Sequence, residues 1–313
     1  MTTKQIYELA VEMGIKADLR GKDSVKKYLE RTKNKYESLN KEAKSEFDRE
    51  KLLNPYSDTR ILVDNGKKQI KKILAGIDID GSEMLLAREI GDIDLVISHH
   101  PTGKALADLH GVMDLQAQVL ADYGVPINIA ESVMRPRISE VARNLSPINH
   151  NRSVDFARHL KLDFMCTHTI ADNLGASFLV KLIKKENPEY VADLIALLKK
   201  IPEYKAAGEF NAGPKVFAGN PENSCGRIVV TEFTGGTSGS KEMYEKMAQA
   251  GIGTIVGIHM GEEHRKEAEK YHLNVVIAGH MSSDSLGMNL FLDELAKKGV
   301  KSEVCSGLIR IKR

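Results

Sequence analysis

Two adjacent histidines, His99 and His100, close the apolar run DLVIS at residues 94–98, and Pro101 follows them directly. Open α/β sheets build their sites at the carboxyl ends of strands, which is the position that this pair takes. Successive residues of a strand point to opposite faces, so both imidazoles can serve one site only if the strand ends there. Proline favours such an end because it lacks the N–H that a sheet needs. We therefore expect His99 and His100 to be ligands in one site.

A histidine is followed four residues later by an aspartate in His110/Asp114, His168/Asp172 and His280/Asp284. On a helix this spacing places both side chains on one face, with Cβ atoms about 5–6 Å apart. The arrangement suits joint metal ligation, or a histidine held by a carboxylate. The second and third pairs follow strand-like runs. The first lies inside an amphipathic helical pattern, where an exposed ion pair is the simpler interpretation.

The strand-end residues together form a set of imidazole and carboxylate ligands without a thiolate: His99, His100, Asp172, His280 and Asp284. Such a set suits catalytic metals, with Zn as the first expectation and Fe, Mn or Co as alternatives. Five ligands exceed what one tetrahedral ion uses, whereas two ions about 3.5–4 Å apart would use them all. A metal pair activates water near neutral pH, so the predicted chemistry is hydrolytic attack on carbon or phosphorus.

Other histidines could assist this chemistry. His168 and His264 are candidates for a catalytic proton relay, and His259 closes a further strand-like run beside the same predicted cleft. The stretch EFTGGTSGSKEM, residues 232–243, offers a second kind of contact. Backbone N–H groups at the start of a helix suit an anion such as phosphate, with the candidate residues Gly235, Gly236, Ser238 and Ser240. The alternative is a tight turn in which Ser238 or Ser240 caps the helix.

The elements that position these residues follow an alternating pattern. From residue 61, short apolar runs alternate with amphipathic helical segments, which predicts an α/β fold with mostly parallel sheets. The strand-like runs lie at residues 71–79, 94–98, 125–132, 162–169, 226–233, 251–259 and 273–280. The segment LADYGVPINIAES resembles AEKYHLNVVIAGH, which favours two related halves around one cleft, although chance similarity is the rival explanation.

This pattern divides the chain into four parts: a charged helical extension at 1–58, a first α/β half at 59–185 with the HHP and HTxxD motifs, a helical connection at 186–222, and a second α/β half at 223–313 with the GHxxxD motif. The extension interleaves Lys with Glu and Asp, which favours a solvated helical hairpin over a nucleic-acid arm.

The composition of the 313 residues sets the broad class. With 42 % hydrophobic residues, 28 % charged residues and a net charge of +2, the chain is typical of a globular protein without a polyanion partner. The sequence contains neither an apolar run of membrane-spanning length nor a secretory signal. Three widely spaced cysteines fit a reducing compartment, so we expect a cytoplasmic protein without nucleic-acid or membrane partners.

The motifs DLVISHHP, THTIAD and AGHMSSDSLGMN, in that order, resemble the Nif-three-like family (NGG-interacting-factor-three-like), also described as GTP cyclohydrolase I type 2 homologues. The resemblance runs from about Lys71 to about Gly299. It implies two similar α/β halves, a ring-shaped homohexamer and two divalent metals between the halves. The implied metal positions are His99, His100, Asp172, His280 and Asp284, with His168 alongside. The family usually has Glu where this chain has Asp284, and Thr-Gly-Glu where it has GIHMGEEH.

Residues and resemblance together predict a dinuclear metal-dependent hydrolase that acts on a small nucleotide-like or phosphorylated substrate. One alternative is a non-catalytic protein that binds or delivers metal. Another is a ring-forming regulatory scaffold whose N-terminal helices bind partners.

Overall fold

The computed structural model describes residues 1–67 and 69–313. Its first sheet has five strands in the order β1-β4-β3-β2-β9, in which β1 runs antiparallel to β4 and the remaining pairs are parallel. Their bounds are β1 (Thr59–Val63), β2 (Lys72–Gly76), β3 (Leu95–Ser98), β4 (Asp163–Thr167) and β9 (Lys301–Cys305). Most of these strands are continuous apolar runs because helices cover both faces of the sheet.

The second sheet has four strands in the order β5-β8-β7-β6, in which only β5 is antiparallel to its neighbour among the described strand pairs. Their bounds are β5 (Lys215–Ala218), β6 (Arg227–Val230), β7 (Ile252–Gly257) and β8 (Asn274–Ile277). Two mostly parallel sheets with flanking helices confirm the predicted fold class of two α/β halves.

Strand β9 connects the end of the chain back to the first half. It pairs in parallel with β2, from Lys72 opposite Lys301 to Gly76 opposite Cys305. The first sheet therefore contains strands from both ends of the sequence. The division at residue 223 into two separate halves stays a prediction.

Helices cover both faces of the first sheet. One face packs against α1 (Thr3–Ala17), α9 (His168–Glu186) and α14 (His280–Lys297). The other packs against α4 (Gly81–Ile90) and α8 (Arg152–Leu160). Among the described helices, none combines the length and the apolar character that crossing a membrane requires.

The second sheet is covered in the same way. One face packs against α6 (Asp114–Asp122), α7 (Ile127–Leu145), α12 (Met243–Gln249) and α13 (Glu262–Lys270). The other face packs against α9, α10 (Val191–Leu198) and α11 (Pro202–Glu209). The short α5 (Gly103–Ala107) and η2 (Leu109–Val112) lead from the first sheet into α6.

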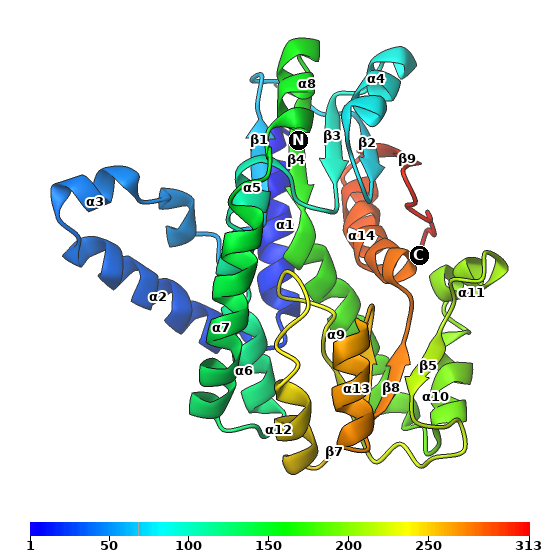
Figure 1. Ribbon diagram of the computed structural model, residues 1–313. Coiled ribbons are helices and arrows are strands. Elements are labelled where there is room, and N and C mark those ends of the chain that lie inside the picture. The colour runs from blue at the N-terminus through cyan, green and yellow to red at the C-terminus, as the bar shows by residue number, and fades with distance from the viewer. Residues whose placement is uncertain (68) are drawn as a thin grey trace.

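Helices α9 and α14 bridge the two sheets and lie side by side at the centre of the molecule (Figure 1). Ile170 of α9 and Met288 of α14 lie in the core of the first half, whereas Leu179 and Leu286 lie in the core of the second. The two helices touch closely at Gly287, where an added Cβ would lie 2.1 Å from the carbonyl oxygen of Ala171. This contact fixes the relative position of the residues that begin both helices.

The N-terminal extension has two unlike parts. Helix α1 is built into the main core, where Ile6 and Ala10 are fully buried. By contrast, α2 (Lys22–Ser38) and α3 (Lys41–Glu46) form an arm that projects from the body before η1 (Arg49–Leu52) returns to it (Figure 1). Val25 is the single buried residue of α2. The predicted solvated hairpin therefore describes the arm alone.

The predicted strand at residues 125–132 was wrong, because this segment begins helix α7. Its isoleucines and valine suggested a strand, but the buried residues Ala130, Met134 and Val141 follow helical spacing. Pro126 stands at the N-cap, where its fixed φ suits the entry to a helix. The similarity between LADYGVPINIAES and AEKYHLNVVIAGH therefore does not correspond to a structural repeat, since the second segment forms the end of α13 and β8.

Candidate metal centre

The adjacent histidines are held where β3 ends. The backbone N–H of His99 donates to Gly76 at 2.9 Å, and that of His100 donates to Ile77 at 2.9 Å. Ser98 donates its hydroxyl to the carbonyl of His100 at 2.8 Å. The two rings thus lie together, with centroids 5.1 Å apart, as the sequence predicts.

The other two histidines each begin a helix. His168 follows β4 as the first residue of α9, and His280 follows β8 as the first residue of α14. Asp172 and Asp284 lie one turn later on the same helix faces. Gly279 makes the tight entry to α14 at φ +110°, where a Cβ would lie 2.7 Å from the carbonyl oxygen of Ala212. A residue with a side chain at 279 would therefore displace His280.

The carboxylate of Asp284 lies at the centre of the cluster. Its Oδ1 is 3.5 Å from Nε2 of His99. Its Oδ2 is 3.5 Å from Nε2 of His100 and 3.6 Å from Nε2 of His280. The two oxygens thus face different histidines, which is the arrangement of a carboxylate that can be shared between two ions.

The carboxylate of Asp172 completes the inner side of the cluster. Its Oδ1 lies 3.4 Å from Nε2 of His99, and its Oδ2 lies 3.9 Å from Nε2 of His168. Three groups offer ligand atoms within 4.8 Å of one another. They are His99/Asp172/Asp284, His100/His280/Asp284 and His99/His100/His168.

The unpaired polar atoms of the centre test whether a metal fits. Among the described residues, both ring nitrogens of His99 and both carboxylate oxygens of Asp284 are buried without a hydrogen-bond partner. Leaving one such group unpaired typically costs about 1–3 kcal/mol. A cation that accepts lone pairs from Nε2 of His99 and from both carboxylate oxygens of Asp284 would satisfy three of these four atoms, so the donor set fits a metal ion.

Electrostatics leave His99 and His100 in different states. Burial lowers the pKa of His99 to about 4, although the charge of Asp284 opposes this. Burial also acts to lower the pKa of His100, but Asp284 and then Asp78 outweigh it and raise the pKa to about 9. His99 is therefore a neutral ligand at neutral pH, whereas His100 must release a proton to bind a metal.

The two central carboxyls also differ. Burial, reinforced by the charges of Asp284 and Asp58, raises the pKa of Asp172 well above its usual range. Burial acts in the same direction on Asp284, but the neighbouring His99 and His100 hold its pKa well below the usual range. Asp284 is therefore the permanent negative charge of the centre.

Two further carboxylates contact the histidines from behind. Oδ1 of Asp78 lies 2.7 Å from Nδ1 of His100, and Oδ2 of Asp58 lies 2.9 Å from Nδ1 of His168. Sequence reasoning missed both. Asp78 follows the end of β2, so the rule applied to strand ends could have found it. Asp58 had only the break after the N-terminal helices as a local signal.

The predicted glycine and serine loop lies beside the cluster. Gly235 and Gly236 have φ near +90°, which only glycine adopts readily. Ser238 lies with its Oγ 3.0 Å from Nδ1 of His259, whose ring centroid is 5.1 Å from that of His280. The loop therefore reaches the centre through His259. Its anion-binding role stays a prediction.

Ser240 and His264 lie farther along this loop. The Ser240 hydroxyl donates to Glu242, and Nε2 of His264 lies 3.1 Å from the carbonyl oxygen of Gly239. His264 lines a separate cavity with Arg137 and Lys241. The structure does not bring His264 into the cluster, and its proposed proton relay stays a prediction.

Glu232 is a further residue that sequence reasoning missed. It follows β6 with φ +56°, an uncommon backbone conformation for a residue with a side chain. Its Oε1 accepts the backbone N–H of Gly239 at 3.2 Å, which closes the base of the loop. It also lines a small cavity of about 20 Å³ together with His168, Asp172, His259 and His280.

A larger cavity opens on the outer side of His100. Its volume is about 270 Å³, and its lining includes Asp78, Thr102, His150 and Arg152. His100 therefore separates the buried cluster from a solvent-accessible space.

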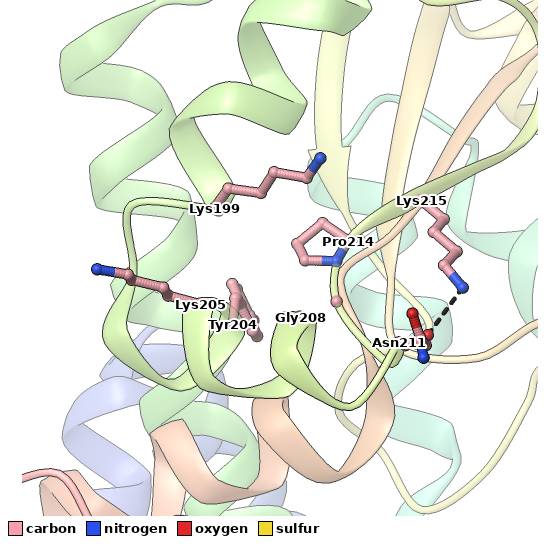
Figure 2. Close-up of a pocket in the computed structure, with 8 residues that line it drawn as sticks. Lys199, Tyr204, Lys205, Gly208, Asn211, Pro214 and Lys215 are labelled. Carbon is pink, nitrogen blue, oxygen red and sulfur yellow. Dashed lines mark hydrogen bonds between the residues drawn. The ribbon is translucent and has the colours of Figure 1, made fainter.

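Another cavity lies behind α14, away from the cluster. It is lined by Tyr204 and three lysines, of which Lys199 and Lys205 extend in different directions (Figure 2). Lys215 donates to the carbonyl of Asn211 at 2.8 Å.

The Tyr204 hydroxyl lies 3.0 Å from that of Ser283, next to Asp284. Tyr204 thereby supports the first turn of α14.

No protein-family model matches the chain. No curated protein matches its sequence significantly. Among solved structures, the NIF3 superfamily protein from Sphaerobacter thermophilus is similar with a TM-score of 0.79 and 24 % identity, covering 98 % of this chain and 99 % of that one. Reduced HcgD from Methanocaldococcus jannaschii is similar with a TM-score of 0.53 and 17 % identity, covering 84 % and 94 %.

These likenesses define the class of fold, an α/β protein of two halves. The chain has the fold of NIF3 superfamily proteins. The predicted resemblance to the Nif-three-like family is thus confirmed at the level of the fold.

Proposed function

We propose that this protein binds two divalent metal ions and is a hydrolase of the GTP cyclohydrolase I type 2-like kind, acting on a small nucleotide-like or phosphorylated molecule. The observation that carries the proposal is the carboxylate of Asp284, whose two oxygens face His99 on one side and His100 with His280 on the other. One shared carboxylate between two imidazole groups is the ligand pattern of a dinuclear centre.

Each ion would have its own part of the ligand set. His99 and Asp172, with His168 beside them, would hold one ion, and His100 with His280 would hold the other. Zn is the first candidate, with Fe, Mn or Co as alternatives, because imidazole and carboxylate donors suit all four. When bound, the ions would supply Lewis acidity and activate a water for hydrolysis.

The surroundings support access for a substrate from the side of His100. The cavity of about 270 Å³ beside this ring approaches the size of small-molecule sites. Arg152 lines it and could hold an anionic group. On the other side, Gly235, Gly236, Ser238 and Ser240 are proposed to contact the substrate.

One observation favours a second candidate, a non-catalytic protein that stores or delivers metal. The cavity that touches His168, Asp172 and His280 directly has a volume of about 20 Å³. That is enough for roughly one water and too small for a nucleotide. A centre reached only by water would bind and release ions without turning over a substrate.

One experiment separates the two candidates. The protein is loaded in turn with Zn²⁺, Mn²⁺, Co²⁺ or Fe²⁺ and assayed against nucleoside triphosphates and phosphomonoesters by product detection. The hydrolase account predicts turnover that disappears in His280→Ala and persists in the control His159→Ala, an exposed residue of α8. Stoichiometric metal without turnover, together with rapid transfer of that metal to a chelator, would support delivery instead.

Assembly and location remain part of the proposal. The family resemblance implies a homohexamer, which sedimentation equilibrium would test directly as a mass six times that of the chain. A cytoplasmic location, a small-molecule substrate and the absence of nucleic-acid or membrane partners stay predictions from composition.

A further inference from the structure

We infer that Asp58 is the positioning residue of the metal centre, supplied by the N-terminal segment to fix the ring of His168. The inference deepens the proposed function and rests on it. Nδ1 of His168 lies 2.9 Å from Oδ2 of Asp58, across 110 positions of sequence. The hydroxyl of Thr169 donates to the same oxygen at 2.6 Å.

The consequence of this contact is a defined tautomer. An ionised carboxylate only accepts hydrogen bonds, so the proton of the neutral imidazole must be on Nδ1. Nε2 then carries the lone pair and faces the cluster, 3.9 Å from Oδ2 of Asp172. Carboxylates that orient metal-binding histidines in this way typically contribute 10–100-fold to metal affinity.

The segment that carries Asp58 is held by side-chain hydrogen bonds. The Tyr56 hydroxyl donates to Asp18 at 2.8 Å, and the side-chain amide of Asn54 donates to the carbonyl of Thr59 at 2.9 Å. Arg60, itself buried, donates to the carbonyls of Tyr56 and Thr59 at 2.7 and 2.9 Å. These bonds close the turn around Asp58, so its carboxylate is fixed before any metal arrives.

The charge environment separates Asp58 from an ordinary structural aspartate. Within residues 1–67 and 69–313, His168 is the only basic side chain within ion-pair distance of Asp58. Its Oδ1 is buried and, among the same residues, has no hydrogen-bond partner. Asp18, in the same N-terminal segment, instead forms a buried ion pair with Arg20 at 2.8 Å. Asp58 is thus a buried carboxylate whose nearest basic side chain is a histidine of the metal centre.

The first test needs no metal and no variant. In the metal-free full-length protein, labelled with ¹⁵N-histidine at pH 8, long-range ¹H–¹⁵N spectra report which ring nitrogen of His168 carries the proton. The inference predicts a proton on Nδ1 of His168. A ring that is protonated at Nε2 alone overturns it. This readout is independent of whether the protein binds metal or hydrolyses anything.

The second test compares two isosteric variants of buried aspartates. Zn²⁺ affinity, measured by chelator competition, should fall about 10–100-fold in Asp58→Asn. It should stay at the wild-type value in Asp163→Asn, a buried aspartate at the start of β4 whose carboxylate accepts from Thr3 and Asn65. Wild-type affinity in Asp58→Asn, or an equal loss in both variants, overturns the inference, since an equal loss indicates general loosening of the fold. If the wild-type protein binds no Zn²⁺ at all, the proposed function fails, while the tautomer still tests Asp58.

Discussion

The carboxylate of Asp284 lies 3.5 Å from the ring nitrogen of His99, and neither group has a hydrogen-bond partner among the residues that the structure describes. His99 follows a strand of the first sheet, and Asp284 lies on the helix that follows a strand of the second. The two halves of the molecule therefore meet at a buried pair of lone-pair donors.

Metal binding should depend on pH because His100 is protonated at neutral pH. Its pKa is raised to about 9 despite burial, chiefly by Asp284 and also by Asp78. A metal must displace this proton, so the affinity should rise by roughly tenfold per pH unit from pH 7 toward 9 and level off above it. Chelator competition across this range measures the slope. An affinity independent of pH would contradict the assigned ligand role of His100.

Asp78→Asn provides the matched control for that titration. It removes the outer carboxylate, which lies 2.7 Å from Nδ1 of His100, and leaves the inner ligands in place. The pKa of His100 should fall, so the rise in affinity should occur at lower pH. An unchanged titration curve in this variant would show that Asp78 does not act on His100.

Asp284→Asn should have the larger effect on metal content. The shared carboxylate faces three histidines, so its loss should affect both ions and exceed the 10–100-fold loss expected for Asp58→Asn. Equilibrium dialysis with Zn²⁺ gives the stoichiometry. Loss of one ion with full retention of the other would show that Asp284 is not shared.

Gly287→Ala should disrupt the centre without touching a ligand. Its Cβ would lie 2.1 Å from the carbonyl oxygen of Ala171, so α14 must move away from α9 next to Asp172. Overpacking of this kind costs about 1–3 kcal/mol, and metal affinity should fall with it. Gly208→Ala on α11 is the control, because a Cβ there meets nothing within 4 Å. Thermal melts and Zn²⁺ titration check both; equal behaviour of the two variants would refute the close-contact argument.

Removal of the projecting arm should leave the centre intact. Replacing residues 22–46 by a short Gly/Ser linker removes α2 and α3. The one buried residue of α2 is Val25. Metal content should stay at the wild-type value. In contrast, Ile6→Ala in α1 should cost about 2–5 kcal/mol of unfolding free energy, since Ile6 is fully buried in the core. Metal loss on removal of the arm would assign it a role in the site.

The strand-end residues could be predicted from sequence because each signal is local. An apolar run followed by a histidine marks the edge of a sheet, and the four-residue spacing of His280 and Asp284 marks a helix face. The contact between Asp58 and His168 has no such signal. It is created by tertiary packing across 110 positions, which a pattern of neighbours does not report.

Local signals also misled where propensity and burial disagree. Ile127 and Ile129 suggested a strand, but Ile127 is exposed, and the buried face of α7 is set by Ala130 and Met134 instead. The pairing of β9 with β2 could not be predicted either, because it joins the two ends of the chain. In both cases the structure of the segment depends on which surface the other elements of the fold leave open for it to cover.

The central claim is that His99 and His100 hold metal between the two halves. Elemental analysis of purified protein, wild type against the double variant His99→Ala/His100→Ala, tests it most directly, with circular dichroism to confirm that the variant is folded. We predict two divalent ions per wild-type chain and loss of bound metal in the folded double variant. Full metal occupancy in that variant would contradict the account.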